Sequence, residues 1–273
     1  MASITAYRHT YSRWLKQYER QAYKLLQSTF DKWGRNIPFA IMSESNYSDV
    51  LNNVISDDPM IRTYETMYTE IGLVHGKRTG RQINRELKFF KPGDFESVFL
   101  NNIGDFLRSF GGERIESVEK TYVEYIKTLL STRLQEGKTI FEAAKEIQEL
   151  VRKPNFYRWQ ALRIARTEST TAANYAATKA NDVTDFVMEK IWISALDSRT
   201  RRTPPDKYDH QDLNGKKVDP DEPFTTSRGE KLRYPGDPGG GGIPKTSAGN
   251  TINCRCSVAY RAKRDKDGNL IDK

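Results

Sequence analysis

Helical periodicity governs the first two thirds of this 273-residue chain and ends near Asp182. Beyond that point, a strand-like alternation around Trp192 is followed by a stretch dense in turn residues, with four consecutive glycines at 239–242. The prolines and glycines of this stretch exclude a helix or a central strand. The sequence therefore predicts an α+β protein, in which a mostly α-helical N-terminal region precedes a small α+β C-terminal domain with a short antiparallel sheet and long loops.

The helical region divides at Gly111–Gly112, where a strongly apolar helix that begins near Phe95 is expected to end. We therefore predict a helical, basic region over residues 1–112, a second domain over 113–260, and a charged, disordered tail over 261–273. Residues 37–58 are rich in turn formers and predict a loop with at most a short helix. Thr139, followed three positions later by Glu142, predicts a capping box at the start of a helix.

Two further patterns in the helical region concern packing. In the first helix, aromatic residues keep to one face, which we interpret as a packing face rather than a platform on which bases stack; they include Tyr7, Tyr11, Trp14 and Tyr18. Further along, Gly72, Gly76 and Gly80 recur at a spacing of four. This spacing either lets another part of the chain approach closely or marks a break in the helix.

The net charge of +8 is concentrated in two segments, residues 1–36 and 77–91, each of which carries a net +5. The rest of the chain is slightly acidic, so the positive field lies where a polyanion can use it. The second segment spaces five cations along one helix: Lys77, Arg78, Arg81, Arg85 and Lys88. Spaced cations contact phosphates without reading sequence, which predicts non-specific contact with double-stranded DNA. A solvated helix face is the alternative interpretation.

Several classes of protein are disfavoured by composition. No apolar run approaches the ~20 residues that a membrane span needs, and the first residues lack the apolar core of a secretion signal. Two cysteines in so long a chain argue against a disulfide scaffold. We therefore expect no membrane span and synthesis in a reducing cytoplasm.

Both cysteines occur close together, in the segment Asn253-Cys254-Arg255-Cys256. In a strand, residues at i and i+2 share a face, so the two thiols are expected to point the same way. Pairing of this strand with the one around Trp192 would bring His210 and Asp197 to the same end. Two thiolates and an imidazole would then supply three ligands of a tetrahedral zinc site, His210, Cys254 and Cys256. Ordinary buried cysteines and a histidine without a ligand are the alternative.

The order of short motifs in the second half resembles the phage Mu F-like head morphogenesis family, the minor head proteins of tailed bacteriophages. The matching elements are Arg163-Ile164-Ala165-Arg166-Thr167-Glu168, Ala172-Ala173-Asn174, Trp192, Asp197-Ser198-Arg199-Thr200-Arg201, His210, Leu213-Asn214-Gly215, Phe224, Tyr234-Pro235-Gly236-Asp237-Pro238 and Asn253-Cys254-Arg255-Cys256. They extend over roughly residues 128–260. One departure is the insertion at 202–209, which separates the arginines from the histidine.

The resemblance implies a virion component that is made in the host cytoplasm and built into the head in several copies near the portal. Its expected partners are the portal protein or capsid and double-stranded DNA, with a part in genome packaging or ejection. In this interpretation the protein is not an enzyme, and a buried ionic network fixes the shape of its C-terminal domain. The residues expected in that network are Arg166, Glu168, Asp197, Arg199 and Arg201. The alternative is a metal-dependent hydrolase or nuclease that uses His210, the two cysteines and an acidic group such as Asp197 or Glu168.

Overall fold

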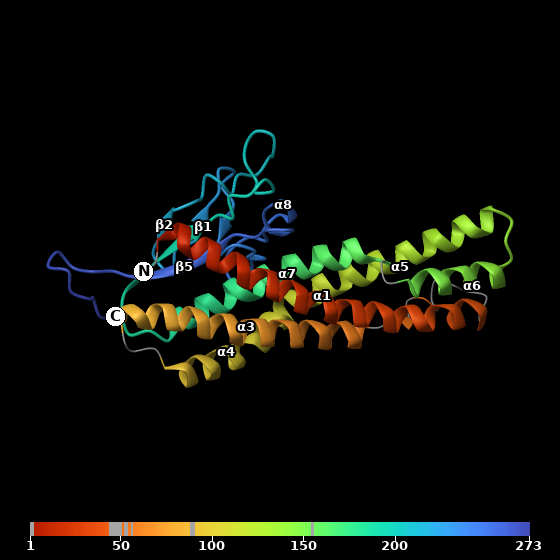
Figure 1. The fold of residues 1–273 in the computed structure, drawn as a ribbon, viewed down its shortest axis with the longest axis horizontal. Helices are drawn as coiled ribbons and strands as arrows, with labels where there is room; N and C mark the ends of the chain where they lie inside the picture. The colour runs from red at the N-terminus through yellow and green to blue at the C-terminus, as the bar shows by residue number, and fades with distance from the viewer. Residues whose placement is uncertain (1–2, 44–50, 52–53, 56, 88–90, 154–155) are drawn as a thin grey trace. The chain divides into compact units, whose positions relative to one another are not determined.

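The computed structural model describes residues 3–43, 51, 54–55, 57–87, 91–153 and 156–273. Its helices are α1 (Ile4–Ser43), α3 (Asp57–Leu87), α4 (Pro92–Phe106), the π-helical turn η1 (Leu107–Gly111), α5 (Gly112–Gln135), α6 (Ile140–Val151), α7 (Arg158–Asp182) and the short α8 (Ala248–Thr251). Its strands are β1 (Met188–Ile193), β2 (Lys217–Val218), β3 (Phe224–Thr225), β4 (Lys231–Leu232) and β5 (Ser257–Ala262). Apart from the short α8, the helices precede the strands along the chain, as Figure 1 shows, and this confirms the predicted α+β class.

The chain forms two compact units, and each is built from separate stretches of sequence. The first unit contains Met1–Ala22, Met67–Asp105 and Arg163–Lys273, and the second contains Tyr23–Thr66 and Phe106–Leu162. The long helices α1 and α3 therefore each contribute residues to both units.

The first unit contains the sheet. In it β1 is the central strand, with β2 on one side and β5 on the other, and both pairings are antiparallel. Trp192 lies opposite Val258 in this register, and Figure 1 shows β1 and β5 side by side. The predicted pairing of the Trp192 strand with the C-terminal strand is therefore confirmed. A separate two-stranded ribbon, β3 with β4, follows β2 along the chain.

The N-terminal part of α1 packs its aromatic face inside this unit. Tyr7, Tyr11 and Tyr18 are each only 2% exposed, which confirms the prediction of a packing face. The Tyr7 hydroxyl also donates to the carbonyl oxygen of Val258 at 3.1 Å. This bond satisfies a strand carbonyl that faces the helix, and it ties α1 to β5.

The glycines of α3 allow close packing rather than a break, because α3 is continuous from Asp57 to Leu87. A Cβ atom built on Gly72 would lie 2.1 Å from the ring of Phe99, and one built on Gly76 would lie 1.8 Å from the ring of Phe95. These distances are far below van der Waals contact. The missing side chains therefore make room for two phenylalanines of α4, which resolves the two alternatives in favour of close approach.

The second unit is held by an aromatic cluster and by well-formed helix ends. Phe30 of α1 stacks on Tyr122 of α5, with ring centroids 5.2 Å apart. At the start of α6 the predicted capping box is confirmed. The amide of Glu142 donates to Thr139 Oγ1, and the amide of Thr139 donates to Glu142 Oε2 at 2.8 Å.

Three local expectations differ from the structure. The apolar helix does not end at Gly111–Gly112, because η1 carries the chain directly into α5. Helix α1 extends through Pro38 to Ser43, into the segment expected to be a loop, while residues 44–50, 52–53 and 56 of that segment lie outside the described residues. The tail after residue 262 is not disordered but pairs Arg264 with Leu270 and Phe186 with Asp272. Local turn hydrogen bonds and a neighbouring strand thus order a sequence whose charge predicted disorder. The predicted domain limits themselves stay a prediction.

Among the helices that the structure describes, none is both long enough and apolar enough to cross a bilayer.

Candidate metal centre

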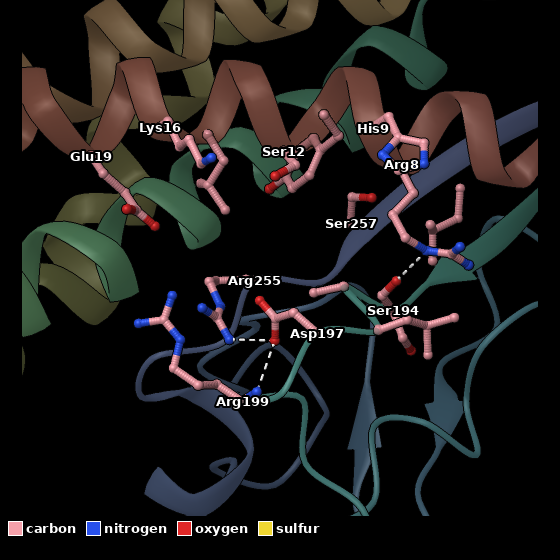
Figure 2. A pocket seen from close by; sticks show the side chains of 15 residues that line it. Arg8, His9, Ser12, Lys16, Glu19, Ser194, Asp197, Arg199, Arg255 and Ser257 are labelled. Atoms are coloured by element: carbon pink, nitrogen blue, oxygen red, sulfur yellow. Dashed lines mark hydrogen bonds and ion pairs between the residues drawn. The ribbon is translucent and has the colours of Figure 1, made fainter.

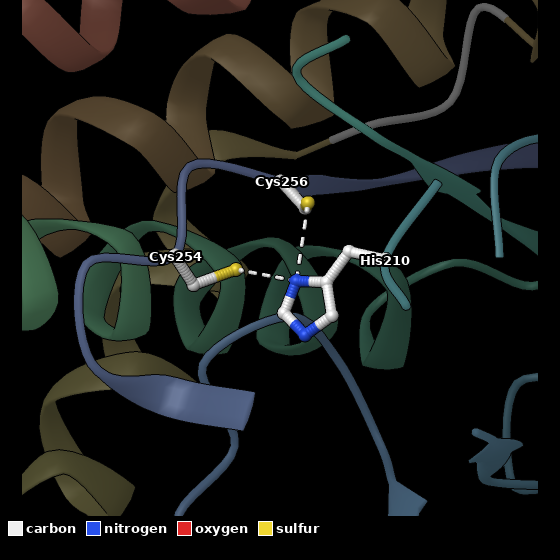
Figure 3. A group of neighbouring side chains, drawn as sticks. All are labelled: His210, Cys254 and Cys256. Carbon is white, nitrogen blue, oxygen red and sulfur yellow. Dashed lines mark hydrogen bonds between the residues drawn. The ribbon is translucent and has the colours of Figure 1, made fainter. Parts of the chain in front are cut away.

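His210, Cys254 and Cys256 meet in the interior of the first unit (Figure 3). The sulfur of each cysteine lies 3.6 Å from Nδ1 of His210, and the three ligand atoms lie within 4.8 Å of one another. All three residues are 2% exposed or less. The sequence predicted that Cys254 and Cys256 lie in a strand. In the structure they lie in the loop before β5, which begins at Ser257. The predicted convergence of these side chains is nevertheless what the structure shows.

A row of polar residues on α7 holds the cysteine segment in place. Thr170 Oγ1 donates to the carbonyl of Cys254 at 2.6 Å. Asn174, which is fully buried, donates from Nδ2 to the carbonyl of Cys256 at 3.1 Å and accepts from the amide of Val258 at 2.8 Å. The amide group of Asn174 thus pairs with the free edge of the chain at β5 as a neighbouring strand would. The buried face of α7 therefore contains polar residues because they replace the backbone hydrogen-bond partners that the loop lacks.

His210 is fixed by contacts on both sides of its ring. Its Nε2 lies 3.1 Å from Asn250 Oδ1, which is an acceptor, so this contact places the ring proton on Nε2. The lone pair of Nδ1 then points toward both sulfurs. On another side, the ring of Trp192 meets the imidazole edge to face at a centroid distance of 5.5 Å. A hydrogen bond from the second ring nitrogen to a protein oxygen is the usual way in which a metal-binding histidine is oriented.

The geometry fits a tetrahedral zinc ion. With zinc–sulfur bonds of about 2.3 Å and a zinc–nitrogen bond of about 2.1 Å, a tetrahedral site separates each sulfur from the nitrogen by about 3.6 Å. Both observed separations are 3.6 Å. Two thiols and one imidazole are ligands that suit zinc. They do not suit magnesium or calcium, which take oxygen ligands.

Zinc binds thiolates, so the protonation of the cysteines matters. The pKa of the Cys256 thiol is held well below its ordinary value, chiefly by a hydrogen bond from Cys254, with further help from the amide of Ala195. The same hydrogen bond, together with burial, raises the pKa of Cys254. The pair therefore holds one negative charge readily, and a cation between the sulfurs would favour the second ionisation.

The predicted acidic companion of this cluster lies elsewhere. Asp197 is 43% exposed and forms an ion pair with Arg255 at 2.7 Å, and its carboxylate also accepts from the amide of Arg199. Within the described chain, the group of possible ligands consists of His210 and the two cysteines, without a carboxylate. A cavity of about 10 Å³ beside them is room for roughly one water molecule.

The expected buried network is instead divided among several partners. Arg166 contacts Glu19 at 3.5 Å and donates to Asn253 Oδ1 at 3.2 Å. Glu168 is buried and accepts from the Tyr68 hydroxyl. Arg201 donates to the carbonyl of Ile252. Arg199 and Asp197 lie at the surface, so burial does not hold for these two residues. The sequence did not indicate Glu19, the partner of Arg166, or Arg255, the partner of Asp197.

The predicted cation row on α3 is partly engaged within the molecule. Lys77 forms an ion pair with Glu96. The guanidinium of Arg78 lies 4.9 Å from the centre of the Trp14 ring and donates to the Tyr18 hydroxyl at 2.9 Å. Arg81 is exposed. The side chain of Arg85 and all of Lys88 lie outside the described residues, so their part of the prediction stays open.

Fold and site together define an α+β protein whose C-terminal loops converge on a buried Cys-Cys-His cluster. Residues 124–259 match the family model described as Phage Mu protein F like protein. The chain belongs to the phage Mu F-like family, and the matched segment contains all three residues of the cluster. The family is one of bacteriophage head-morphogenesis proteins, which supports a component of the virion.

A curated relative is NAD(+)--arginine ADP-ribosyltransferase EFV of Enterococcus faecalis (strain ATCC 700802 / V583). The two are 34% identical over 152 residues, which is 54% of this chain and 27% of the relative. The chain thus spans about a quarter of the length of that protein. No solved structure matches the chain.

Proposed function

We propose that this head protein acts near the portal, and that its C-terminal module is a rigid body organised by a structural zinc ion. The observation that carries the second part is the buried cluster of His210, Cys254 and Cys256, with both sulfur–nitrogen distances at 3.6 Å. Membership of the family supports a location in the phage head. The proposal adds the portal as partner, the host cytoplasm as the place of synthesis, and a role in packaging or ejection.

A structural ion suits the surroundings of this cluster. The strands β2, β3 and β4 have two residues each and α8 has four, so the loops around the cluster contain little regular structure. His210 precedes these strands in the sequence, and the two cysteines follow them. An ion bound to all three would close a loop of more than forty residues, which lowers the entropy of the unfolded chain. Binding of zinc then contributes directly to folding.

We also propose non-specific contact with double-stranded DNA through the basic helices. Arg13, Lys16 and Arg20 are exposed on α1, and Arg81 is exposed on α3. Cations of this kind bind phosphates with an affinity that falls steeply as the salt concentration rises. In a plot of log affinity against log salt concentration, each contact steepens the slope by about 0.9.

The DNA contact is tested by measuring the affinity for a duplex at several salt concentrations. The double variant Arg13→Gln/Arg20→Gln should lower the slope by about 2. Lys216→Gln is the matched control, since Lys216 is exposed but paired with Asp212 at 2.6 Å. A wild-type affinity that does not depend on salt would contradict this part of the proposal. Crosslinking in purified heads tests the location, because a protein that lies near the portal should crosslink to the portal and not only to the major capsid protein.

A metal-dependent hydrolase is the second candidate, and one observation favours it. Three protein ligands leave a fourth position for water, which is the arrangement of catalytic zinc sites. The adjoining cavity of about 10 Å³ opposes it, because it is too small for a substrate. A structural role is therefore our proposal, and the protein is not expected to be an enzyme. Loss of zinc together with loss of folded structure in His210→Ala would support the structural role. A zinc-dependent hydrolytic activity of the folded protein would favour the hydrolase.

A further inference from the structure

A second cavity lies in the first unit. It has a volume of about 270 Å³ and is lined by the N-terminal half of α1, by the end of β1 with the turn that follows it, and by Arg255 and Ser257. Figure 2 shows charged side chains from both sides facing this space. Of the lining residues, the proposed function uses Lys16 alone, as one of several exposed cations.

The charges around this cavity are unequal. Four permanent cations line it, Arg8, Lys16, Arg199 and Arg255, against the two carboxylates of Glu19 and Asp197. The carboxylates already have partners, since Asp197 pairs with Arg255 and Glu19 lies 3.5 Å from Arg166. Arg8 donates to the carbonyl of Ser194 at 2.8 Å.

Two exposed cations of the lining, Lys16 and Arg199, remain available to a ligand. The cavity therefore offers the charge that would balance an anion of charge −2.

Three residues of this lining also carry unpaired donors. Tyr11 Oη, Ser257 Oγ and Arg255 Nε are buried and have no hydrogen-bond partner among the described residues. Tyr11 is 2% exposed and Ser257 is 1% exposed. Buried polar atoms are almost always paired, so three unpaired donors around one cavity indicate that an acceptor is missing. An oxyanion has several acceptor oxygens and would serve all three.

We propose that this cavity binds a phosphomonoester carried by an organic group. The doubly charged phosphate matches Lys16 and Arg199, and its oxygens accept from the unpaired donors. The organic part contacts the apolar remainder of the lining, which includes Leu15, Ile193 and Leu196. A volume of about 270 Å³ exceeds what a bare phosphate needs and lies near the lower end of small-molecule sites, at roughly 300 Å³. Two sources share this chemistry: a free mononucleotide and the 5′-phosphorylated end of a DNA strand.

Calorimetry on the full chain tests the proposal with deoxyadenosine monophosphate, deoxyadenosine and inorganic phosphate. The nucleotide should bind, and the nucleoside, which lacks the phosphate, should bind at least tenfold more weakly. Tyr11→Phe and Lys16→Gln should each weaken nucleotide binding about tenfold, because each removes one contact to a charged ligand. Lys24→Gln is the matched control, since Lys24 is an exposed cation of the same helix that does not line the cavity.

Lys16→Gln decides the matter if Tyr11→Phe does not fold, because Lys16 is exposed and its replacement leaves the core intact. Equal binding of nucleotide and nucleoside, or an equal loss in Lys16→Gln and Lys24→Gln, would overturn the proposal. So would the absence of nucleotide binding.

The two sources are separated with oligonucleotides of one sequence that carry either a 5′-phosphate or a 5′-hydroxyl. A preference for the phosphorylated end that Lys16→Gln removes identifies a DNA end as the ligand, while nucleotide binding without this preference identifies the free nucleotide. The readout is the end group rather than the salt slope, so it fails or succeeds independently of non-specific DNA binding.

Discussion

Asn174 is the residue whose removal should affect the first unit most. Its side chain is fully buried and joins α7 to two separate loops. It donates to the carbonyls of Pro235 and Cys256 at 3.0 and 3.1 Å, and it accepts from the amide of Val258 at 2.8 Å. The variant Asn174→Ala removes all three bonds and leaves their backbone partners buried.

The size of the effect follows from these three groups. A buried polar group that loses its partner costs about 1–3 kcal/mol. With two to three such groups, we expect Asn174→Ala to lower the free energy of unfolding by about 2–9 kcal/mol. Domains of this size are stable by about 5–15 kcal/mol, so the variant should be close to unfolding.

Urea unfolding followed by tryptophan fluorescence measures this effect, because Trp192 is fully buried in the same unit. The midpoint should fall by at least about 1 M. Asn101→Ala is the matched control, since Asn101 is exposed on α4 and should change stability by less than about 0.5 kcal/mol. A loss below about 1 kcal/mol in Asn174→Ala would refute the claim that this amide acts as a substitute strand.

Three further predictions concern packing, capping and pH. Gly76→Ala should cost about 1–3 kcal/mol, because its Cβ would lie 1.8 Å from a ring atom, whereas Gly112→Ala, with no atom within 4 Å, should not destabilise; thermal unfolding compares them. The capping box lowers the pKa of Glu142, so its contribution is full above the ordinary value of 4.5 and is lost as the pH falls through the lower folded value. The difference in melting temperature between wild type and Thr139→Ala should therefore narrow in acid, and a constant difference would contradict this. Burial lowers the pKa of His75 to about 3 from 6.5, so the unfolded state takes up the proton first and stability falls as the pH drops below 6.5. Between pH 7 and 5 the wild type should lose about 2 kcal/mol more than His75→Gln, and equal losses would show that His75 ionises normally.

The sequence predicted the features that depend on local pattern. The aromatic face of α1, the capping box at Thr139 and the pairing of β1 with β5 all follow from periodicity and spacing, and the structure confirms them. The convergence of His210 with the two cysteines followed from that strand pairing, because the pairing fixes where the ends of both segments meet.

Partners that are distant in sequence could not be predicted in the same way. Glu19 of α1 and Arg255 beside the cysteines have no pattern that relates them to Arg166 or Asp197, and only the fold brings them together. Asn174 lies in an alanine-rich helix and looks like an ordinary helix residue until the edge of β5 is placed against it. The spacing of the α3 glycines was ambiguous for a similar reason, since only the rings of α4 show that the missing side chains make room for a neighbour.

The bound metal is the most direct test of the claim that a zinc ion organises the C-terminal module. Elemental analysis of the protein purified without chelators should find one zinc per chain, and Cys254→Ser, Cys256→Ser and His210→Ala should each abolish it. Removal of zinc from the wild type should lower its melting temperature, and readdition should restore it. A folded wild-type protein that contains less than about 0.1 zinc per chain and does not change in stability when zinc is added would contradict the account.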